Sequence, residues 1–219
     1  MKLILTSGSI SNKSLENELK SVIGKDFKDL KMLFCTTASN YAGGEMNDWL
    51  IEDLNYFKDA GFKIDICDIS GIGIEKFLPR FEWADVYFFE GGDTQWLISC
   101  IKSSGLEEHL TKLLETRVWI GASAGSCALC PAVCSAYKDL FDENLWDYPA
   151  DGLGFVDFRF IPHLNSEWFP EMREEKLRNA IKNIKKADDR KFYVLDDDGA
   201  VFVDGENVKV ISEGTWFEA

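Results

Sequence analysis

The amino-acid sequence predicts an α/β fold, a three-layer sandwich with helices on both faces of a mostly parallel sheet. Apolar runs alternate with helical patterns between residues 2 and 120, and strands separated by helices form such sheets. Towards the C-terminus, strand-like runs follow one another directly, which indicates antiparallel pairing. Because no linker, repeat or low-complexity stretch divides the chain, we expect a single domain over residues 1–219.

Five apolar runs are predicted as the parallel strands, and the segments between them carry the three- and four-residue apolar spacing of amphipathic helices. The predicted strands are Lys2–Thr6, Lys31–Thr36, Phe62–Ile66, Ala84–Phe89 and Val118–Ile120. The predicted helices cover Leu15–Ile23, Glu45–Ala60, residues 94–100 and residues 106–114. Gly61 stands where a glycine commonly ends the second of these helices.

The pattern changes after about residue 155. Phe158–Ile161 is predicted as a strand and Glu171–Lys186 as a charged amphipathic helix. Three further short strands are predicted at Phe192–Leu195, Ala200–Val203 and Val208–Ile211. Asp204-Gly205 between the last two is a strong signal for a tight hairpin turn. We therefore expect the C-terminal part to add antiparallel strands to one side of the sheet.

The charge balance excludes several classes of partner. The chain has 24 Lys and Arg against 38 Asp and Glu, a net charge of −14, whereas binding to a nucleic-acid backbone or an anionic membrane needs a basic surface. No apolar run approaches the ~18 residues of a membrane span, and the N-terminus has no signal-peptide pattern. We expect a cytoplasmic protein, a monomer or a homodimer, without nucleic-acid or membrane partners.

The six cysteines are expected to be small buried residues rather than disulfides, because the protein is predicted to be cytosolic. Cys127, Cys130 and Cys134 have spacings seen in metal sites. Only these three are close in sequence and no histidine is near them, so the buried face of a helix is the favoured interpretation. No metal and no organic cofactor is expected.

The most specific local motif is Gly-Ala-Ser-Ala-Gly at residues 121–125, between a predicted strand and a helical run at Ser126–Val133. A serine on a tight strand-to-helix turn is held away from its neighbours, and flanking glycines relieve the crowding. The helix N-terminus behind it offers free N–H groups to an oxyanion. The motif therefore predicts Ser123 as a nucleophile; a turn of small residues that merely packs closely is the alternative.

A serine nucleophile needs a base, usually histidine, and the chain has only two histidines. His109 lies in a helical run beside two glutamates and is interpreted as a solvated helix residue. His163 follows a predicted strand, which would bring it to the carboxyl edge of the sheet, where open α/β folds bind ligands. His163 is therefore the predicted base, with a purely structural histidine as the alternative.

The third member should be a carboxylate that orients the imidazole. Three consecutive acids, residues 196–198, follow the predicted strand Phe192–Leu195; each alone would be interpreted as part of a solvated turn. In ordinary α/β-hydrolases the acid precedes the histidine. Here the order Ser123, His163, Asp197 fits the sequence better.

A second glycine motif, Gly91-Gly92-Asp93-Thr94, ends the fourth predicted strand and begins a helix. Its glycines permit close approach of the backbone to a ligand. The Gly92 amide is predicted as one oxyanion donor and the Ala124 amide as the other. A tight turn capped by Asp93 or Thr94 is compatible with this role, and a phosphate loop is disfavoured because no Lys-Ser/Thr follows.

Together these motifs resemble one family, peptidase E: the aspartyl dipeptidases of the serine peptidase family that also contains cyanophycinases. The resemblance implies a fold like that of the class I glutamine amidotransferases (flavodoxin-like) and a Ser-His-acid triad. The matching segments span nearly the whole chain in the family's order: Gly91–Thr94, Trp119–Gly125, Cys130-Pro131, Pro162-His163, Arg173-Glu174 and Leu195–Gly199.

The resemblance also bears on the acid and on the substrate. The family's acid is usually a glutamate in a Leu-x-Glu-Gly-like segment; ungapped matching assigns it to Asp197, and a shift of one residue that keeps the glycine assigns it to Asp198. We predict Asp197. Arg173 matches a family arginine and is predicted to pair with a substrate carboxylate; a structural ion pair with the neighbouring glutamates is the alternative.

The chain departs from the family pattern at three places. Asp93 stands where the family usually has asparagine, Ala122 precedes the predicted nucleophile where a bulky residue is common, and the family's aspartate after Cys-Pro is poorly matched near Lys138-Asp139. These differences leave the predicted triad intact. They weaken the expectation of a preference for peptides with N-terminal Asp.

The leading hypothesis is a serine-type peptidase that hydrolyses small peptides, such as dipeptides with N-terminal Asp, through an acyl-enzyme. An esterase or amidase with the same serine and a non-catalytic ligand-binding protein on this scaffold remain alternatives. A cyanophycinase is disfavoured because its polymeric substrate usually requires a longer chain. Tyr137–Asp151, rich in aromatic and acidic residues, is a candidate lid by position.

Overall fold

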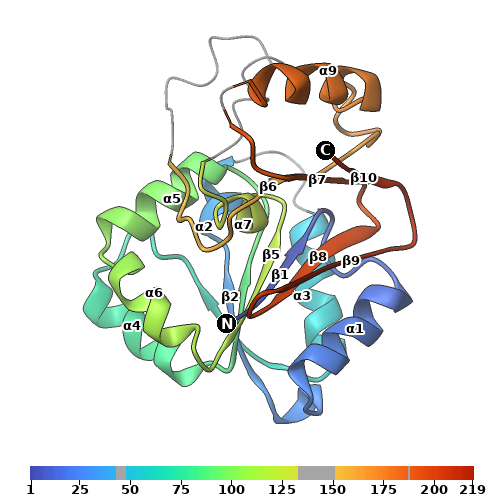
Figure 1. Ribbon diagram of the computed structural model, residues 1–219. Coiled ribbons are helices and arrows are strands. Elements are labelled where there is room, and N and C mark those ends of the chain that lie inside the picture. Colours follow the sequence, from blue (N-terminus) through green and yellow to red (C-terminus); the bar gives the residue numbers. More distant parts are fainter. Residues whose placement is uncertain (43–47, 133–150, 187) are drawn as a thin grey trace.

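The computed structural model describes residues 1–42, 48–132, 151–186 and 188–219, and has the predicted α/β architecture (Figure 1). Its main sheet has seven strands in the order β3-β2-β4-β5-β1-β8-β9. The first five are parallel: β3 (Lys63–Cys67), β2 (Lys31–Cys35), β4 (Val86–Phe89), β5 (Val118–Ala122) and β1 (Lys2–Thr6). The hairpin of β8 (Gly199–Asp204) and β9 (Asn207–Ser212) adds two antiparallel strands beside β1.

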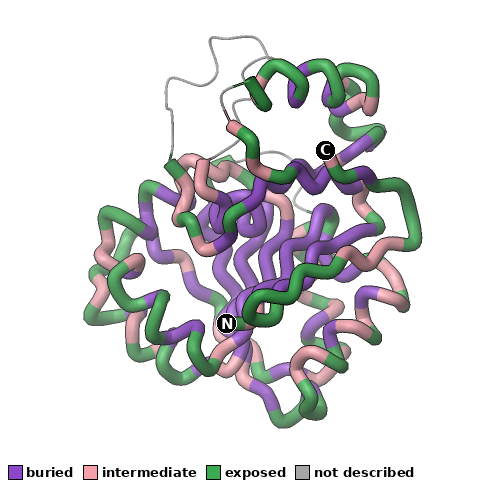
Figure 2. Tube along the Cα trace, in the orientation of Figure 1, coloured by how far each residue is buried: buried purple, intermediate pink, exposed green. Residues whose placement is uncertain are grey.

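Helices cover both faces of this sheet because side chains alternate between the faces along each strand. On β1, Leu3 and Leu5 face one apolar cluster and Ile4 faces the other. The first cluster is covered by α4 (Ile74–Trp83), α5 (Thr94–Ser103), α6 (Glu107–Leu113) and α7 (Ala124–Cys127). The second is covered by α1 (Lys13–Ile23), the 3-10 helix Phe27–Asp29 and α3 (Asp48–Asp59). Figure 2 shows that the central strands of the sheet are buried, whereas the edge strand β9 is largely exposed or half-buried.

A second, three-stranded sheet lies at the end of the molecule to which the parallel strands point (Figure 1). It consists of β10 (Trp216–Glu218), β7 (Phe192–Leu195) and β6 (Arg159–Ile161), with β6 and β7 parallel and β10 antiparallel to β7. The amphipathic helix α9 (Glu174–Ile184) packs on it through a separate apolar cluster. This small sheet carries two of the predicted site segments to the carboxyl edge of the main sheet.

The prediction that all C-terminal strands join the main sheet is wrong for Phe192–Leu195. This strand pairs with β6 and β10 instead, because its fully buried residues pack between α9 on one face and the main core on the other. Within the described residues, two α-helices were not predicted: α2 (Thr37–Ala42), rich in poor helix formers, and α4, which contains Pro79. The predicted helix Ser126–Val133 is also too long, because α7 ends at Cys127 and turns follow it.

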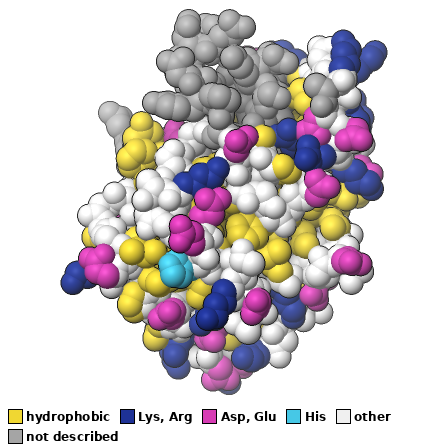
Figure 3. Space-filling view, turned by 60° about the vertical axis from the view of Figure 1, so that its left-hand side comes forward, with side chains coloured by type: hydrophobic (Ala, Val, Ile, Leu, Met, Phe, Trp, Pro, Cys, Tyr) yellow, Lys and Arg dark blue, Asp and Glu magenta, His cyan; other side chains and the backbone are white. Residues whose placement is uncertain are grey.

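The surface combines both signs of charge. Figure 3 shows acidic and basic side chains interspersed over one face of the molecule. In the part of the chain that the structure describes, no helix is long and apolar enough to cross a membrane.

Candidate active site

Ser123 occupies a strained turn between β5 and α7. Its φ of 44° and ψ of −99° lie in a region that non-glycine residues rarely adopt, at a cost of about 1–3 kcal/mol. Both flanking glycines are required by packing: a Cβ at Gly125 would overlap the Phe89 carbonyl oxygen, and one at Gly121 would overlap Gly125 itself. No residue larger than glycine therefore fits at positions 121 and 125, and the close packing on both sides of Ser123 holds the turn in its strained conformation.

Hydrogen bonds to neighbouring strands hold this turn in place. The Ser123 amide donates to the Thr6 carbonyl at 3.1 Å, which extends the ladder between β1 and β5 by one residue. The Trp119 indole donates to the Gly125 carbonyl at 3.1 Å. The buried Ser126 hydroxyl lies 2.9 Å from the Thr6 carbonyl oxygen and 2.7 Å from that of Gly121. The turn is therefore anchored to β1 as well as to its own strand.

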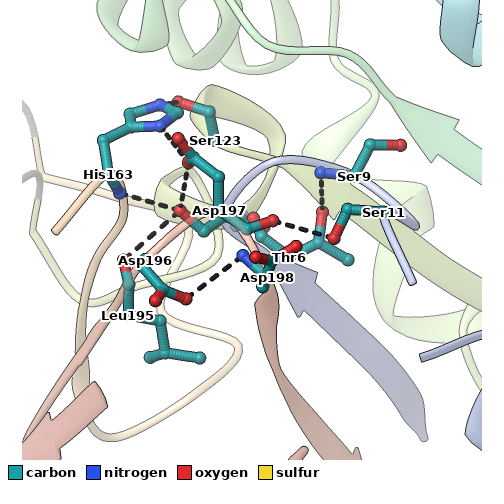
Figure 4. A network of polar contacts seen from close by, with 11 residues as sticks. Thr6, Ser9, Ser11, Ser123, His163, Leu195, Asp196, Asp197 and Asp198 are labelled. Atoms are coloured by element: carbon teal, nitrogen blue, oxygen red, sulfur yellow. Dashed lines mark hydrogen bonds and ion pairs between the residues drawn. The ribbon is translucent and has the colours of Figure 1, made fainter. Parts of the chain in front are cut away.

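His163 reaches Ser123 from the loop after β6. Its Nε2 lies 2.8 Å from Ser123 Oγ (Figure 4). The residue has a left-handed backbone, with φ of 65°, and its ring stacks on Phe169 at 4.3 Å between centroids. The next residue, Leu164, donates its amide to the Leu195 carbonyl at 3.0 Å. The histidine loop is thereby tied to the strand that leads to the acids.

Of the three consecutive acids, Asp197 is the one that contacts His163. Its Oδ1 lies 2.6 Å from His163 Nδ1. Asp196 instead accepts hydrogen bonds from the amides of Asp198 and Thr215, within its own loop. The backbone carbonyl of Asp198 accepts from the Asn12 side chain. The geometry thus separates Asp197 from Asp198, which spacing alone leaves open.

The Asp197 carboxylate is held in its charged form. Burial raises its pKa, but hydrogen bonding and charge from His163, together with hydrogen bonds from Ser7 and Ser166, outweigh burial and lower the pKa below the usual value. A charged carboxylate at Nδ1 fixes the proton on that nitrogen and leaves Nε2 free to accept the proton of Ser123.

Ser7 also belongs to this network, although none of the sequence motifs includes it. It is fully buried, and its hydroxyl donates to Asp197 Oδ1 at 3.0 Å while accepting the His163 amide at 2.7 Å. The available signal was its place directly after β1: the register pairs Thr6 with Ala122, so Ser7 and Ser123 leave adjacent strands together. Ser7 positions both the base and the acid.

The two predicted oxyanion donors flank Ser123. A Cβ added at Gly91 would lie 3.6 Å from Ser123 Cβ, so the Gly91-Gly92 turn packs beside the serine. Gly92 has φ of 126°, and a side chain there would collide with Ala38. Within the described part of the chain, neither the Gly92 amide nor the Ala124 amide has an acceptor. Both N–H groups are therefore available to a ligand.

The Asp93 side chain interacts with the helix that follows this turn. Its carboxylate caps α5 by accepting the Trp96 amide at 2.7 Å. An aspartate performs this capping role as well as the asparagine usual in the resembled family.

Arg173 lies directly before α9, on the loop that also carries His163. It is half-buried. The neighbouring acids have other partners, since Glu171 pairs with Lys176 and Glu174 with Arg178. Among the described residues, the Arg173 guanidinium forms no ion pair, so the structural ion pair considered from the sequence is not observed there.

The other residues considered in the sequence are the second histidine, the cysteines with metal-like spacing and the candidate lid. His109 is exposed on α6. Across the four described ranges, no cluster of His, Cys, Asp or Glu could hold a metal ion. Cys134 and all of the candidate lid Tyr137–Asp151 except its last residue lie outside the described residues.

Comparison with known protein families identifies the family of this chain. The model of peptidase family S51 matches residues 3–211. The chain belongs to peptidase family S51. Family S51 proteins are peptidases, so the chain is a peptidase, a hydrolase of peptide bonds. The resemblance to peptidase E seen in the sequence motifs is confirmed.

Named relatives and solved structures agree with this assignment. The chain is 25% identical over 200 residues to an uncharacterized peptidase of Listeria monocytogenes, covering 83% of this chain and 93% of that protein. It is 28% identical over 191 residues to peptidase E of Streptomyces coelicolor, covering 83% and 74%. A crystal structure of a peptidase E protein from Listeria monocytogenes superposes with a TM-score of 0.76 at 19% identity, covering 97% of this chain and 98% of that one. A peptidase from an acI-B1 Actinobacterium superposes with a TM-score of 0.70 at 18% identity, covering 98% and 88%. The relatives therefore agree with the S51 assignment, and the solved structures agree with the predicted fold.

Proposed function

We propose that this S51 peptidase is a serine-type enzyme that hydrolyses small peptides through an acyl-enzyme. The observation that carries the proposal is the unbroken hydrogen-bonded path from Ser123 Oγ through the His163 ring to Asp197 Oδ1, with distances of 2.8 and 2.6 Å. A serine, an imidazole and a carboxylate in this order can perform nucleophilic acyl transfer.

In the proposed reaction, Ser123 Oγ attacks the scissile carbonyl carbon while His163 Nε2 takes the hydroxyl proton. Asp197 stabilises the resulting imidazolium. The negative charge on the substrate oxygen is accepted by the amides of Gly92 and Ala124. His163 then gives its proton to the leaving amine. Water replaces the amine: it attacks the acyl carbon while His163 takes its proton, and His163 returns that proton to Ser123 Oγ as the acid product leaves.

We further propose a short peptide with N-terminal Asp as substrate and a cytoplasmic location. The similarity to peptidase E of Streptomyces coelicolor supports the substrate class. The half-buried Arg173, which forms no ion pair among the described residues, supports recognition of a carboxylate. No cofactor takes part in the proposed steps.

The direct test of the serine mechanism is intact-protein mass spectrometry after incubation with a fluorophosphonate. We expect one covalent adduct on Ser123, because a fluorophosphonate reacts with a serine activated by a base. The adduct should be lost in Ser123→Ala, and its rate of formation should fall by about 10²-fold or more in His163→Ala. His109→Ala is the matched control and should label at the wild-type rate.

The same experiment separates the alternatives. A folded protein that forms no adduct would contradict the serine mechanism and favour a ligand-binding protein. An adduct on Ser123 together with turnover of esters or amides that lack a free α-amine, and none of dipeptides, would favour an esterase or amidase.

Arg173 is predicted to contribute specificity rather than chemistry. Its replacement by alanine should lower kcat/KM for Asp-Leu by about tenfold to a hundredfold, the effect of losing a hydrogen-bonded charge pair. Hydrolysis of Ala-Leu should change little. Arg178→Ala, which removes an arginine from the exposed side of α9, is the control. An equal loss for both dipeptides in Arg173→Ala would contradict recognition of the aspartate side chain.

A further inference from the structure

A buried acid with no catalytic assignment lies directly behind the proposed oxyanion turn. Glu90 follows β4 and immediately precedes Gly91-Gly92. It is 1% exposed. Its Oε1 accepts the Gly91 amide at 2.9 Å, and its own amide donates to the Cys35 carbonyl at 3.1 Å. The side chain therefore folds back onto the turn that packs against Ser123.

A second acid faces this carboxyl group. Asp53 of α3 is close enough to the Glu90 carboxyl for the charge of Asp53 to raise the pKa of Glu90. Among the described residues, Glu90 Oε2 and Ser9 Oγ are buried and have no hydrogen-bond partner. Buried polar atoms are normally hydrogen-bonded, and a contact between two carboxyl oxygens is a hydrogen bond only when one of them carries a proton.

The charges around the pair favour that shared proton. No Lys or Arg in the described ranges pairs with Glu90 or Asp53, and Glu52 adds a further negative charge beside Asp53. Burial, followed by the charge of Asp53, raises the pKa of Glu90 well above its usual value. Burial also raises the pKa of Asp53, to about 6. Two carboxyl groups in contact cannot both ionise readily.

We propose that protonated Glu90 is a positioning residue that holds the Gly91-Gly92 turn against Ser123, with Asp53 accepting a hydrogen bond from the Glu90 carboxyl group. Glu90 Oε1 fixes the Gly91 amide, and the hydrogen bond from Oε2 to Asp53 fixes the carboxyl group against α3. The neutral form matters for the chemistry, because a second negative charge behind the turn would oppose an oxyanion at the Gly92 amide. This inference rests on the proposed function for its catalytic consequence, but not for the shared proton.

The decisive comparison is between Glu90→Gln and Glu90→Ala. Glutamine reproduces the neutral acid: its amide oxygen can accept from Gly91 and its NH2 group can donate to Asp53. We expect Glu90→Gln to react with a fluorophosphonate within about threefold of the wild-type rate. Glu90→Ala should react about tenfold to a hundredfold more slowly, less than the loss of an oxyanion donor itself. Glu108→Gln, on the exposed side of α6, is the control for the substitution.

Two further measurements do not depend on activity. An infrared spectrum at neutral pH should contain a protonated carboxyl band that Glu90→Gln removes and Glu108→Gln keeps. Hydrogen exchange of the Gly91 amide should be slow in the wild type and in Glu90→Gln, and faster in Glu90→Ala. If the wild type forms no fluorophosphonate adduct, the proposed function fails, and these two measurements still decide the role of Glu90.

The pH dependence of stability gives an independent check. The folded protein retains a proton that the unfolded chain releases near the ordinary glutamate pKa of 4.5, so the free energy of unfolding should fall as the pH rises above that value. Glu90→Gln should remove most of this fall, and it remains informative where the alanine variant does not fold. The proposal is overturned if Glu90→Gln leaves the carboxyl band in place, if it slows labelling as much as Glu90→Ala, or if Glu90→Ala labels and exchanges like the wild type.

Discussion

Replacing Ser123 with alanine is expected to lower the turnover of peptides by about 10⁴-fold or more, because the variant retains the oxyanion donors but has no atom that can form the acyl-enzyme. The fold should survive, since the Ser123 side chain is hydrogen-bonded among the described residues only to the His163 ring, and the backbone of the turn is held by other residues. The measurement is kcat for a dipeptide panel that begins with Asp-X, accompanied by thermal unfolding of each variant.

The matched control is Ser103→Ala, which removes a hydroxyl from the exposed end of α5. Its turnover should equal that of the wild type. Wild-type turnover by Ser123→Ala with an unchanged Tm would contradict the mechanism, because no other serine in the described residues is hydrogen-bonded to a histidine side chain.

The second large effect is expected from Asp197→Asn. The asparagine amide would donate to His163 Nδ1 and hold the imidazole in the tautomer whose Nε2 already carries a proton. Nε2 could then no longer accept the proton of Ser123, and kcat should fall by about 10²- to 10⁴-fold with little change in KM. The lower end of this range reflects the 40% exposure of the Asp197 side chain, which lets water replace part of the interaction.

Asp198→Asn is the control that tests the choice between neighbouring acids. The Asp198 side chain is not hydrogen-bonded to His163 in the described structure, so we expect kcat within about twofold of the wild-type value. A larger loss in Asp198→Asn than in Asp197→Asn would contradict the proposed role of Asp197.

Asp197→Asn should also change how the free energy of unfolding depends on pH. The pKa of Asp197 is lowered in the folded protein, so its ionisation stabilises the fold above the ordinary aspartate value of 3.8 and ceases to do so as the pH falls through the folded value. The difference in unfolding free energy between the wild type and Asp197→Asn should therefore shrink as the pH falls below 3.8. A difference that grows in acid would contradict the direction of this pKa shift.

Much of the fold follows from local sequence patterns. Lys2–Thr6 and Phe192–Leu195 form strands with the predicted bounds. The predicted hairpin between β8 and β9 is present, with Asp204 as the last residue of β8 and Gly205 and Glu206 as its two turn residues. These elements are predictable because their alternation and turn residues are local properties of the chain. The helix α4 escaped prediction for a local reason, since Pro79 disrupts its pattern.

Local patterns in the sequence were enough to predict an α/β protein of the peptidase E type and to name a serine, a histidine and a segment of acids. Three features required the folded arrangement: which acid faces His163, the pairing of β7 with β6 rather than with the main sheet, and the link that Ser7 makes between the base and the acid. The electrostatic effect of Asp53 on the buried Glu90 likewise joins residues that are far apart in the sequence. These features depend on how separate elements pack, whereas the motifs that named the candidates lie within single turns of the chain.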